Sequence, residues 1–320
     1  MTFKIDESLH WTDHYVKYGF VSLRRLVDHS WCDEALNEVK KIVCNDRPLT
    51  EWVNDNPEKH NNSDAHPGQW HYPFFQDPGR MGGRTGWTPQ NPILESLYDQ
   101  PRLRTVLDQL HGDPDAWDGV RNYYIFLNPY NPKAKTEIEP QGHIDFKVPI
   151  PVLYRGFTFQ IALVDTEPFS GNTTIYPGTH VPVQKALMAD PNRAITQANE
   201  SLTGPVEPYE FVAKAGDVLF MHHLVYHSGN PSHAPNRKPR IGLHAESFRK
   251  EWPTSIDPNK VTMSPWERSL ALNGFHEAND EAAPQRKRRN RRLQQIEKDT
   301  GVQVDKKWKH FSDWPKPAYQ

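Results

Sequence analysis

Gln141-Gly142-His143-Ile144-Asp145 is the stretch that decides how the rest of this chain is interpreted. Its histidine and aspartate are two residues apart, and alternate side chains of an extended segment point to the same face. One short segment can therefore provide two metal ligands on one side. A third ligand has to come from elsewhere in the chain, and Val225-Tyr226-His227-Ser228-Gly229-Asn230 offers His227 far downstream.

Two histidines and one carboxylate on one face of a metal, with the opposite positions open, are typical of non-haem Fe(II) oxygenases. The residues before His227 support it as the third ligand. Gly216-Asp217 predicts a turn, and the apolar run Val218 to Val225 predicts one strand with His227 at its far end. The same alternation leaves His223 open as an alternative ligand, because it has the strand parity of His227.

An arginine begins the next predicted strand, in Pro239-Arg240-Ile241-Gly242-Leu243-His244. The planar guanidinium of Arg240 presents two parallel donors to a carboxylate, a geometry that the point charge of a lysine lacks. An arginine beside the metal segment therefore suits the remote carboxylate of a dicarboxylic co-substrate.

These segments occur in the order seen in phytanoyl-CoA-dioxygenase-like Fe(II)/2-oxoglutarate oxygenases, which the chain resembles over about residues 10–248. The segments that resemble the family are the run Tyr18 to Leu23, His143-Ile144-Asp145, residues 172–180, Gly216-Asp217, residues 227–230 and Pro239-Arg240. The resemblance implies Fe(II), 2-oxoglutarate and dioxygen as cofactors, with His143, Asp145 and His227 as iron ligands.

The resemblance also implies roles around the iron. Arg240 would pair with the far carboxylate of 2-oxoglutarate. It is preferred to Arg237 because it directly follows Pro239 at the strand start, as in the family pattern. The carboxylate of Asp145 favours hydroxylation over halogenation, because related halogenases have a small residue there. His180, after Pro-Gly-Thr, would be structural.

Further pocket residues are expected from strand positions and from a long connection. Tyr124, Gln160 and Thr174 are expected to point inward, where they line the co-substrate pocket or simply fill the barrel. Residues 45–92 form a connection rich in proline, asparagine, glycine and aromatic residues, and connections that long are often lids. Trp70, Tyr72 and Phe75 are the expected substrate contacts there, or they pin the loop to the body.

Composition sets the class of protein. The 320 residues have a formal charge of −2 and a pI near 6.8, so no global field indicates nucleic-acid or membrane binding. The mean hydropathy is −0.81, but 14 Phe, 10 Trp and 12 Tyr provide core material.

Cys32 and Cys44 fall in one predicted helix, about 18 Å apart, too far for a disulfide. Without an apolar leader or an 18-residue apolar run, a cytoplasmic location is expected.

The order of elements predicts a mainly β fold with a helical layer. Helices are expected at 9–18, from a Ser30 cap onward, and at 93–111 with an interruption near Pro101. Short strands follow, and they predict a double-stranded β-helix, the jelly-roll core of cupin-like proteins. The whole chain, 1–320, is expected to be one catalytic domain, with the oxygenase core at about 10–248 and a helical C-terminal extension at 249–320.

The partners and the reaction follow from this assignment. The basic run 286–292 lacks interleaved aromatic residues, so nucleic-acid binding is not favoured, and the extension can instead contact a second copy of the chain. The expected reaction is hydroxylation of a small molecule, such as a specialised metabolite, with release of succinate and CO2. Enzymes of this kind also desaturate, cyclise or epimerise. A non-catalytic jelly-roll binding protein and a zinc hydrolase with the same two-His-one-Asp site are the alternatives.

Overall fold

A computed structural model gives the fold of residues 7–44, 70–73, 91–118, 124–128, 142–144, 156–189, 200–230, 232, 238–249, 256–257 and 259–271. The predicted residues Asp145, Phe75 and Arg237, most of the 45–92 lid and the basic run 286–292 lie outside these described residues. No helix among the described residues is long and apolar enough to cross a membrane.

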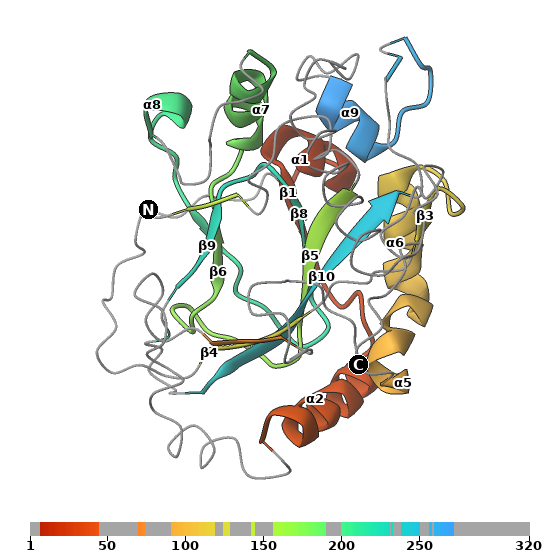
Figure 1. Ribbon diagram of the computed structural model, residues 1–320, viewed down its shortest axis with the longest axis vertical. Coiled ribbons are helices and arrows are strands. Elements are labelled where there is room, and N and C mark those ends of the chain that lie inside the picture. The colour runs from red at the N-terminus through yellow and green to blue at the C-terminus, as the bar shows by residue number, and fades with distance from the viewer. Residues whose placement is uncertain are drawn as a thin grey trace, which may run out of the picture.

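A seven-stranded antiparallel sheet forms the centre of the described fold (Figure 1). Its strands lie in the order β1-β8-β5-β10-β4-β2, and β3 pairs with the far end of β10. Their bounds are β1 Phe20–Leu23, β2 Trp70–Pro73, β3 Trp117–Asp118, β4 Tyr124–Asn128, β5 Gly156–Ala162, β8 Val218–His222 and β10 Arg240–Arg249. The predicted strand at 20–23 is confirmed residue for residue.

A second, three-stranded antiparallel sheet lies opposite, in the order β7-β6-β9. It consists of β6 Thr173–Ile175, β7 Tyr209–Glu210 and β9 His227–Gly229. The chain passes from the large sheet to the small one after β5 and again after β8, and Figure 1 shows the two sheets separated by the interior. Two antiparallel sheets connected in this way are consistent with a jelly-roll-type core.

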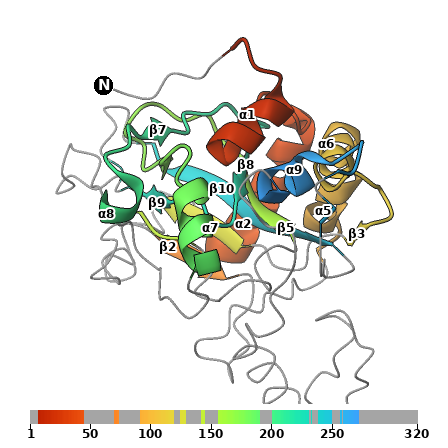
Figure 2. The ribbon, with the colours of Figure 1, turned by 90° about the horizontal axis from the view of Figure 1, so that it is seen from above.

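Helices cover the outer face of the large sheet (Figures 1 and 2). They are α1 Trp11–Tyr18, α2 His29–Cys44, α5 Pro92–Glu95, the 3-10 turn η1 Ser96–Asp99, α6 Pro101–His111 and α9 Pro265–Ala271. The break before Pro101 is at the predicted place, because a proline cannot continue the preceding turn. Two further helices, α7 His180–Ala189 and α8 Glu200–Thr203, were not expected from the sequence and lie beside the small sheet.

Strand alternation separates the large sheet into an apolar and a mixed face. On β5, Phe157, Phe159 and Ile161 pack in the main core with the helices, whereas Ala162 belongs to the smaller cluster between the sheets. That smaller cluster closes one part of the interior with residues such as Ile175, Leu219 and Met221. The polar residues of the inner face lie toward β10 and β4, and it is there that the site is found.

One predicted strand is wrong in a way that matters for the site. The run Val218 to Val225 was expected to be a single strand, but β8 ends at His222. The chain turns there, because the N–H of Val225 donates to the His222 carbonyl at 3.0 Å and the N–H of Leu224 donates to His222 Nδ1 at 3.1 Å. His227 therefore begins a new strand in the other sheet, and the shared parity of His223 and His227 no longer applies.

The predicted Ser30 helix cap is also wrong. Helix α2 begins at His29, and the N–H of Cys32 donates to the Asp28 carbonyl, so the helical hydrogen bonds start before Ser30. The reason is a tertiary contact: the N–H groups of Leu26 and Val27 both donate to the carbonyl of Gly216 and fix where the chain enters the helix.

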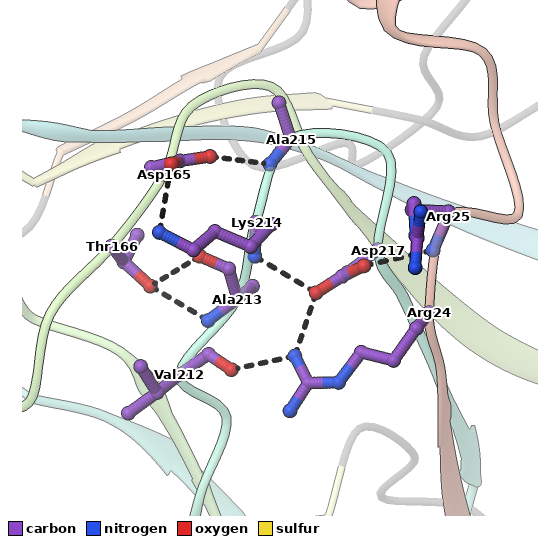
Figure 3. Close-up of polar contacts among 9 residues, drawn as sticks. All are labelled: Arg24, Arg25, Asp165, Thr166, Val212, Ala213, Lys214, Ala215 and Asp217. Carbon is purple, nitrogen blue, oxygen red and sulfur yellow. Dashed lines mark hydrogen bonds and ion pairs between the residues drawn. The ribbon is translucent and has the colours of Figure 1, made fainter.

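The predicted turn at Gly216-Asp217 holds the segment after β1 against the start of β8 (Figure 3). The buried Asp217 carboxylate accepts hydrogen bonds from the backbone N–H groups of Arg25 and Lys214, at 2.8 Å each, and from the Arg24 guanidinium at 2.6 Å. Gly216 has φ +85°, and a Cβ there would lie 2.3 Å from the Val27 carbonyl oxygen. This turn therefore ties the edge strand β1 to the start of β8.

Candidate metal and co-substrate site

The structure brings together the two histidines that the sequence selects, His143 and His227. Their backbones form an isolated antiparallel bridge, with reciprocal N–H to carbonyl hydrogen bonds of 2.8 and 3.0 Å. The centroids of the two imidazole rings are 4.6 Å apart. Because directly opposed residues of an antiparallel pair point to the same side, both rings lie on one face.

The hydrogen bonding of His227 suits a metal ligand. Its Nδ1 lies 3.1 Å from the Val225 carbonyl oxygen, which can only accept, so Nδ1 must carry the proton. The neutral ring then has its lone pair on Nε2. A backbone carbonyl that fixes the tautomer of a ligating histidine in this way is the usual outer-shell partner in metal sites.

The remaining ligand of the predicted set, Asp145, lies outside the described residues. Within the described part of the chain, no group of three His, Cys, Asp or Glu side chains could hold a metal ion. His143 and His227 still fit a divalent iron. Both would bind the metal through an imidazole nitrogen, the two rings lie side by side, and the tautomer of His227 is fixed.

Arg240, the predicted co-substrate anchor, is a buried cation at the start of β10. The residue is 6% exposed. The guanidinium donates to the Gly171 carbonyl at 3.0 Å, to Gln160 Oε1 at 2.9 Å and to Thr173 Oγ1 at 2.7 Å. These three partners are uncharged, and a buried guanidinium attracts an anionic ligand more strongly than an exposed one does.

An aromatic ring supports the guanidinium from one side. The Arg240 Cζ lies 3.9 Å from the centroid of the Phe126 ring, a close cation–π contact. Gly242, two residues along β10, leaves room for this ring, since a Cβ at that position would lie 2.3 Å from Phe126 Cζ. Neither Phe126 nor Gly242 was selected from the sequence, because their proximity depends on the register between β4 and β10.

Gln160 lies where the sequence placed it, on the inner face, and its neighbours define a polar cluster. Its Oε1 accepts from Arg240 and from Thr173 Oγ1, at 2.9 and 2.6 Å. Thr173, rather than the predicted Thr174, is therefore the inward-facing threonine of β6. Thr174 has the opposite strand parity, and its Oγ1 accepts from the Asn230 amide.

Strand register gives the spacing between the histidine pair and the arginine cluster. His227 pairs with Ile175 and Gly229 pairs with Thr173 in the small sheet. His227 is thus one inward-facing position away from the threonine that contacts Arg240, which is about 7 Å along a strand. A five-carbon dicarboxylate has a length of the same order, so one such molecule can reach from the histidines to the guanidinium.

Two other buried histidines, His180 and His222, have structural roles. His180 is fully buried and donates from Nε2 to the Val16 carbonyl at 3.2 Å, and its ring lies 5.1 Å from that of His222. Desolvation lowers the pKa of His180 to about 4, and desolvation also holds the pKa of His222 well below its usual value. Both rings are therefore neutral packing groups, as the resemblance implied for His180.

The predicted aromatic pocket residues are placed by their backbones alone. Tyr124 pairs with His244, an inner-face register position. Trp70 and Tyr72 form part of β2, where their backbones pair with those of Leu127 and Ile125 in β4. The substrate contact expected of Trp70 and Tyr72 stays a prediction.

A protein-family model supports the assignment. The model for phytanoyl-CoA dioxygenase (PhyH) matches residues 15–240, more than half of the chain. The chain belongs to the phytanoyl-CoA dioxygenase family. As a member of this family it is a 2-oxoglutarate-dependent oxidoreductase that uses Fe(II), 2-oxoglutarate and dioxygen.

Two solved structures have a fold similar to that of this chain. The crystal structure of the epimerase SnoN in complex with Fe3+, alpha ketoglutarate and nogalamycin RO has a TM-score of 0.53 and 18% identity, covering 80% of this chain and 91% of that one. The non-heme alpha ketoglutarate dependent carbocyclase SnoK from nogalamycin biosynthesis has a TM-score of 0.52 and 17% identity, covering 78% and 85%. No curated protein matches the chain by sequence.

Proposed function

We propose that this chain is an Fe(II)/2-oxoglutarate-dependent dioxygenase that hydroxylates a small molecule and releases succinate and CO2. The observation that supports this most directly is the His143–His227 bridge, which aligns two imidazoles from segments 84 residues apart in the sequence. The buried Arg240, on the large sheet, reaches across the interior to Thr173 of the small sheet. A double-stranded β-helix core, in one catalytic domain, is part of the same proposal.

Each residue has a distinct role in this proposal. His143, His227 and Asp145 would hold the iron, and Arg240 would bind the remote carboxylate of 2-oxoglutarate. Gln160 and Thr173 orient the guanidinium, while Tyr124 occupies a neighbouring register position on the inner face. When bound, iron and 2-oxoglutarate together supply the oxidant that takes a hydrogen atom from the substrate.

The reaction class is the finer part of the proposal. SnoN and SnoK, which this chain resembles in fold, are named as an epimerase and a carbocyclase, so one fold of this kind serves several outcomes. Hydroxylation adds one oxygen atom to the substrate, whereas epimerisation leaves its mass unchanged and ring closure lowers it. The mass of the product therefore distinguishes the three.

Succinate formation tests the proposal directly. The wild-type protein, loaded with Fe(II) under argon and then exposed to air with 2-oxoglutarate and a metabolite library, is expected to form succinate above the His143→Ala blank. His29→Ala serves as a matched control, because His29 is an exposed histidine on α2. Equal succinate from the wild-type and His143→Ala proteins would overturn the proposal.

A further inference from the structure

The inner face of β10 has a buried histidine, His244, that the proposed chemistry does not use. His244 is 3% exposed and follows Arg240 by four residues, so the two share a strand face. The backbone register pairs His244 with Gln160 on one side and with Tyr124 on the other. His244 therefore lies directly beside the amide that contacts the co-substrate anchor.

Hydrogen-bond chemistry fixes which end of the Gln160 amide faces which neighbour. A guanidinium can only donate, so the atom of Gln160 that lies 2.9 Å from Arg240 Nη2 must be the carbonyl oxygen Oε1. The amide nitrogen Nε2 must then face the other way. It lies 3.4 Å from His244 Nδ1.

The same reasoning determines the protonation of His244. An amide nitrogen donates, so His244 Nδ1 has to accept, which requires an unprotonated Nδ1 and a proton on Nε2. If Gln160 turned over, its NH2 group would oppose the donors of Arg240. His244 stabilises the observed orientation, because its Nδ1 then accepts from the Gln160 amide.

We infer that His244 is a positioning residue, which holds the Gln160 amide so that its oxygen orients the Arg240 guanidinium toward the remote carboxylate of 2-oxoglutarate. This inference rests on the proposed function. It assigns to His244 an effect on co-substrate affinity that acts through Gln160, without contact with iron, 2-oxoglutarate or substrate.

Co-substrate affinity in a double-mutant cycle tests the inference. Fe(II) and 2-oxoglutarate are titrated anaerobically into wild-type, His244→Leu, Gln160→Met and the double variant, and the visible charge-transfer band reports binding. His244→Leu is expected to weaken 2-oxoglutarate binding by about tenfold, with iron affinity unchanged. In the Gln160→Met background the same change is expected to have little effect, because the amide it acts on is gone.

Two further measurements separate positioning from general damage to the fold. His244→Gln, which retains an acceptor, is expected to recover part of the affinity, and the ¹⁵N shifts of the wild-type imidazole are expected to show protonation at Nε2 alone. An equal loss of affinity in both backgrounds, or no loss in His244→Leu, would overturn the inference. Failure of the wild-type protein to bind 2-oxoglutarate at all would instead overturn the proposed function.

Discussion

Arg240 is held by uncharged groups from β4, β5 and β6 and from the loop before β6. Gly171, Gln160 and Thr173 accept its hydrogen bonds, and its Cζ lies 3.9 Å from the centroid of the Phe126 ring. Removing a cation from water costs free energy, and a role in binding an anion gives a reason to bury this one.

Replacing this arginine should therefore separate co-substrate binding from iron binding. Arg240→Ala is expected to raise the dissociation constant of 2-oxoglutarate by about two orders of magnitude, since losing a buried hydrogen-bonded charge partner costs about 2–5 kcal/mol. Iron affinity should change little. Anaerobic titration of each component measures both, with the exposed Arg102→Ala as control. Equal losses for iron and 2-oxoglutarate would show that a different residue is the anchor.

Gly242 offers a test of the ring that supports the guanidinium. A Cβ at Gly242 would lie 2.3 Å from Phe126 Cζ and 2.5 Å from the Ile161 carbonyl oxygen, so Gly242→Ala must displace the ring. The expected cost is about 1–3 kcal/mol of stability, as for other overpacked sites, together with weaker 2-oxoglutarate binding. Gly204→Ala is the control. It faces open space at φ +69°, so it should cost about 1 kcal/mol of backbone strain and leave 2-oxoglutarate affinity unchanged. Urea unfolding and the same titration provide the two readouts.

At the scale of elements, the β7–β8 turn depends on one buried carboxylate. Asp217 is 1% exposed and accepts two backbone N–H groups besides the half-exposed Arg24 (Figure 3). Asp217→Ala leaves those N–H groups without their acceptor, and the expected loss is about 2–4 kcal/mol in urea unfolding. Lys214→Ala removes only an exposed ion pair with Asp165 and should unfold close to the wild-type midpoint. A similar loss in both variants would contradict this account of the turn.

Two buried histidines, His180 of α7 and His222 of β8, should make the stability of the fold depend on pH. Desolvation lowers the pKa of His180 to about 4 and holds that of His222 well below 6.5, so folding favours their neutral forms. The unfolded chain binds protons on these rings below pH 6.5. Their contribution to stability is therefore complete above that pH, and it is lost as pH falls from 6.5 toward about 4.

The free energy of unfolding is accordingly expected to fall as the pH is lowered from 7.5 to 5. This pH range lies above the one in which carboxyl groups titrate. Urea titrations at pH 7.5, 6 and 5 measure this fall, and His180→Gln should reduce its slope. A slope in His180→Gln as steep as in the wild-type protein would mean that other groups cause the pH dependence.

At the scale of the whole molecule, the sequence predicted what local patterns encode. Strand Phe20–Leu23 and the break at Pro101 follow from alternation and proline chemistry. The resemblance selected His143 and His227, which the structure places side by side. What the sequence could not provide is cross-strand register. Thr173 instead of Thr174, the Phe126 ring and the role of His244 all depend on which residues of β4, β5, β6 and β10 lie opposite one another. The turn after His222 was missed because its residues are as apolar as a strand.

The two sheets are joined at the site by side chains from both, so ligand binding should stabilise the molecule as a whole. Arg240 of the large sheet contacts Thr173 of the small one, and His227 lies one inward position from that threonine. A ligand that binds only the folded state adds RT ln(1 + [L]/Kd), about 2.7 kcal/mol at a hundredfold excess over Kd.

Fe(II) and 2-oxoglutarate, added under argon, are therefore expected to raise the thermal midpoint by several degrees in scanning calorimetry. The two ligands should contribute separately: Arg240→Ala should lose the increment of 2-oxoglutarate and retain that of iron, whereas His143→Ala should lose both, because 2-oxoglutarate needs the metal to chelate. Removing iron with a chelator should return the wild-type midpoint to its starting value. A full shift in the His143→Ala protein would place the iron elsewhere and separate the His143–His227 bridge from the chemistry.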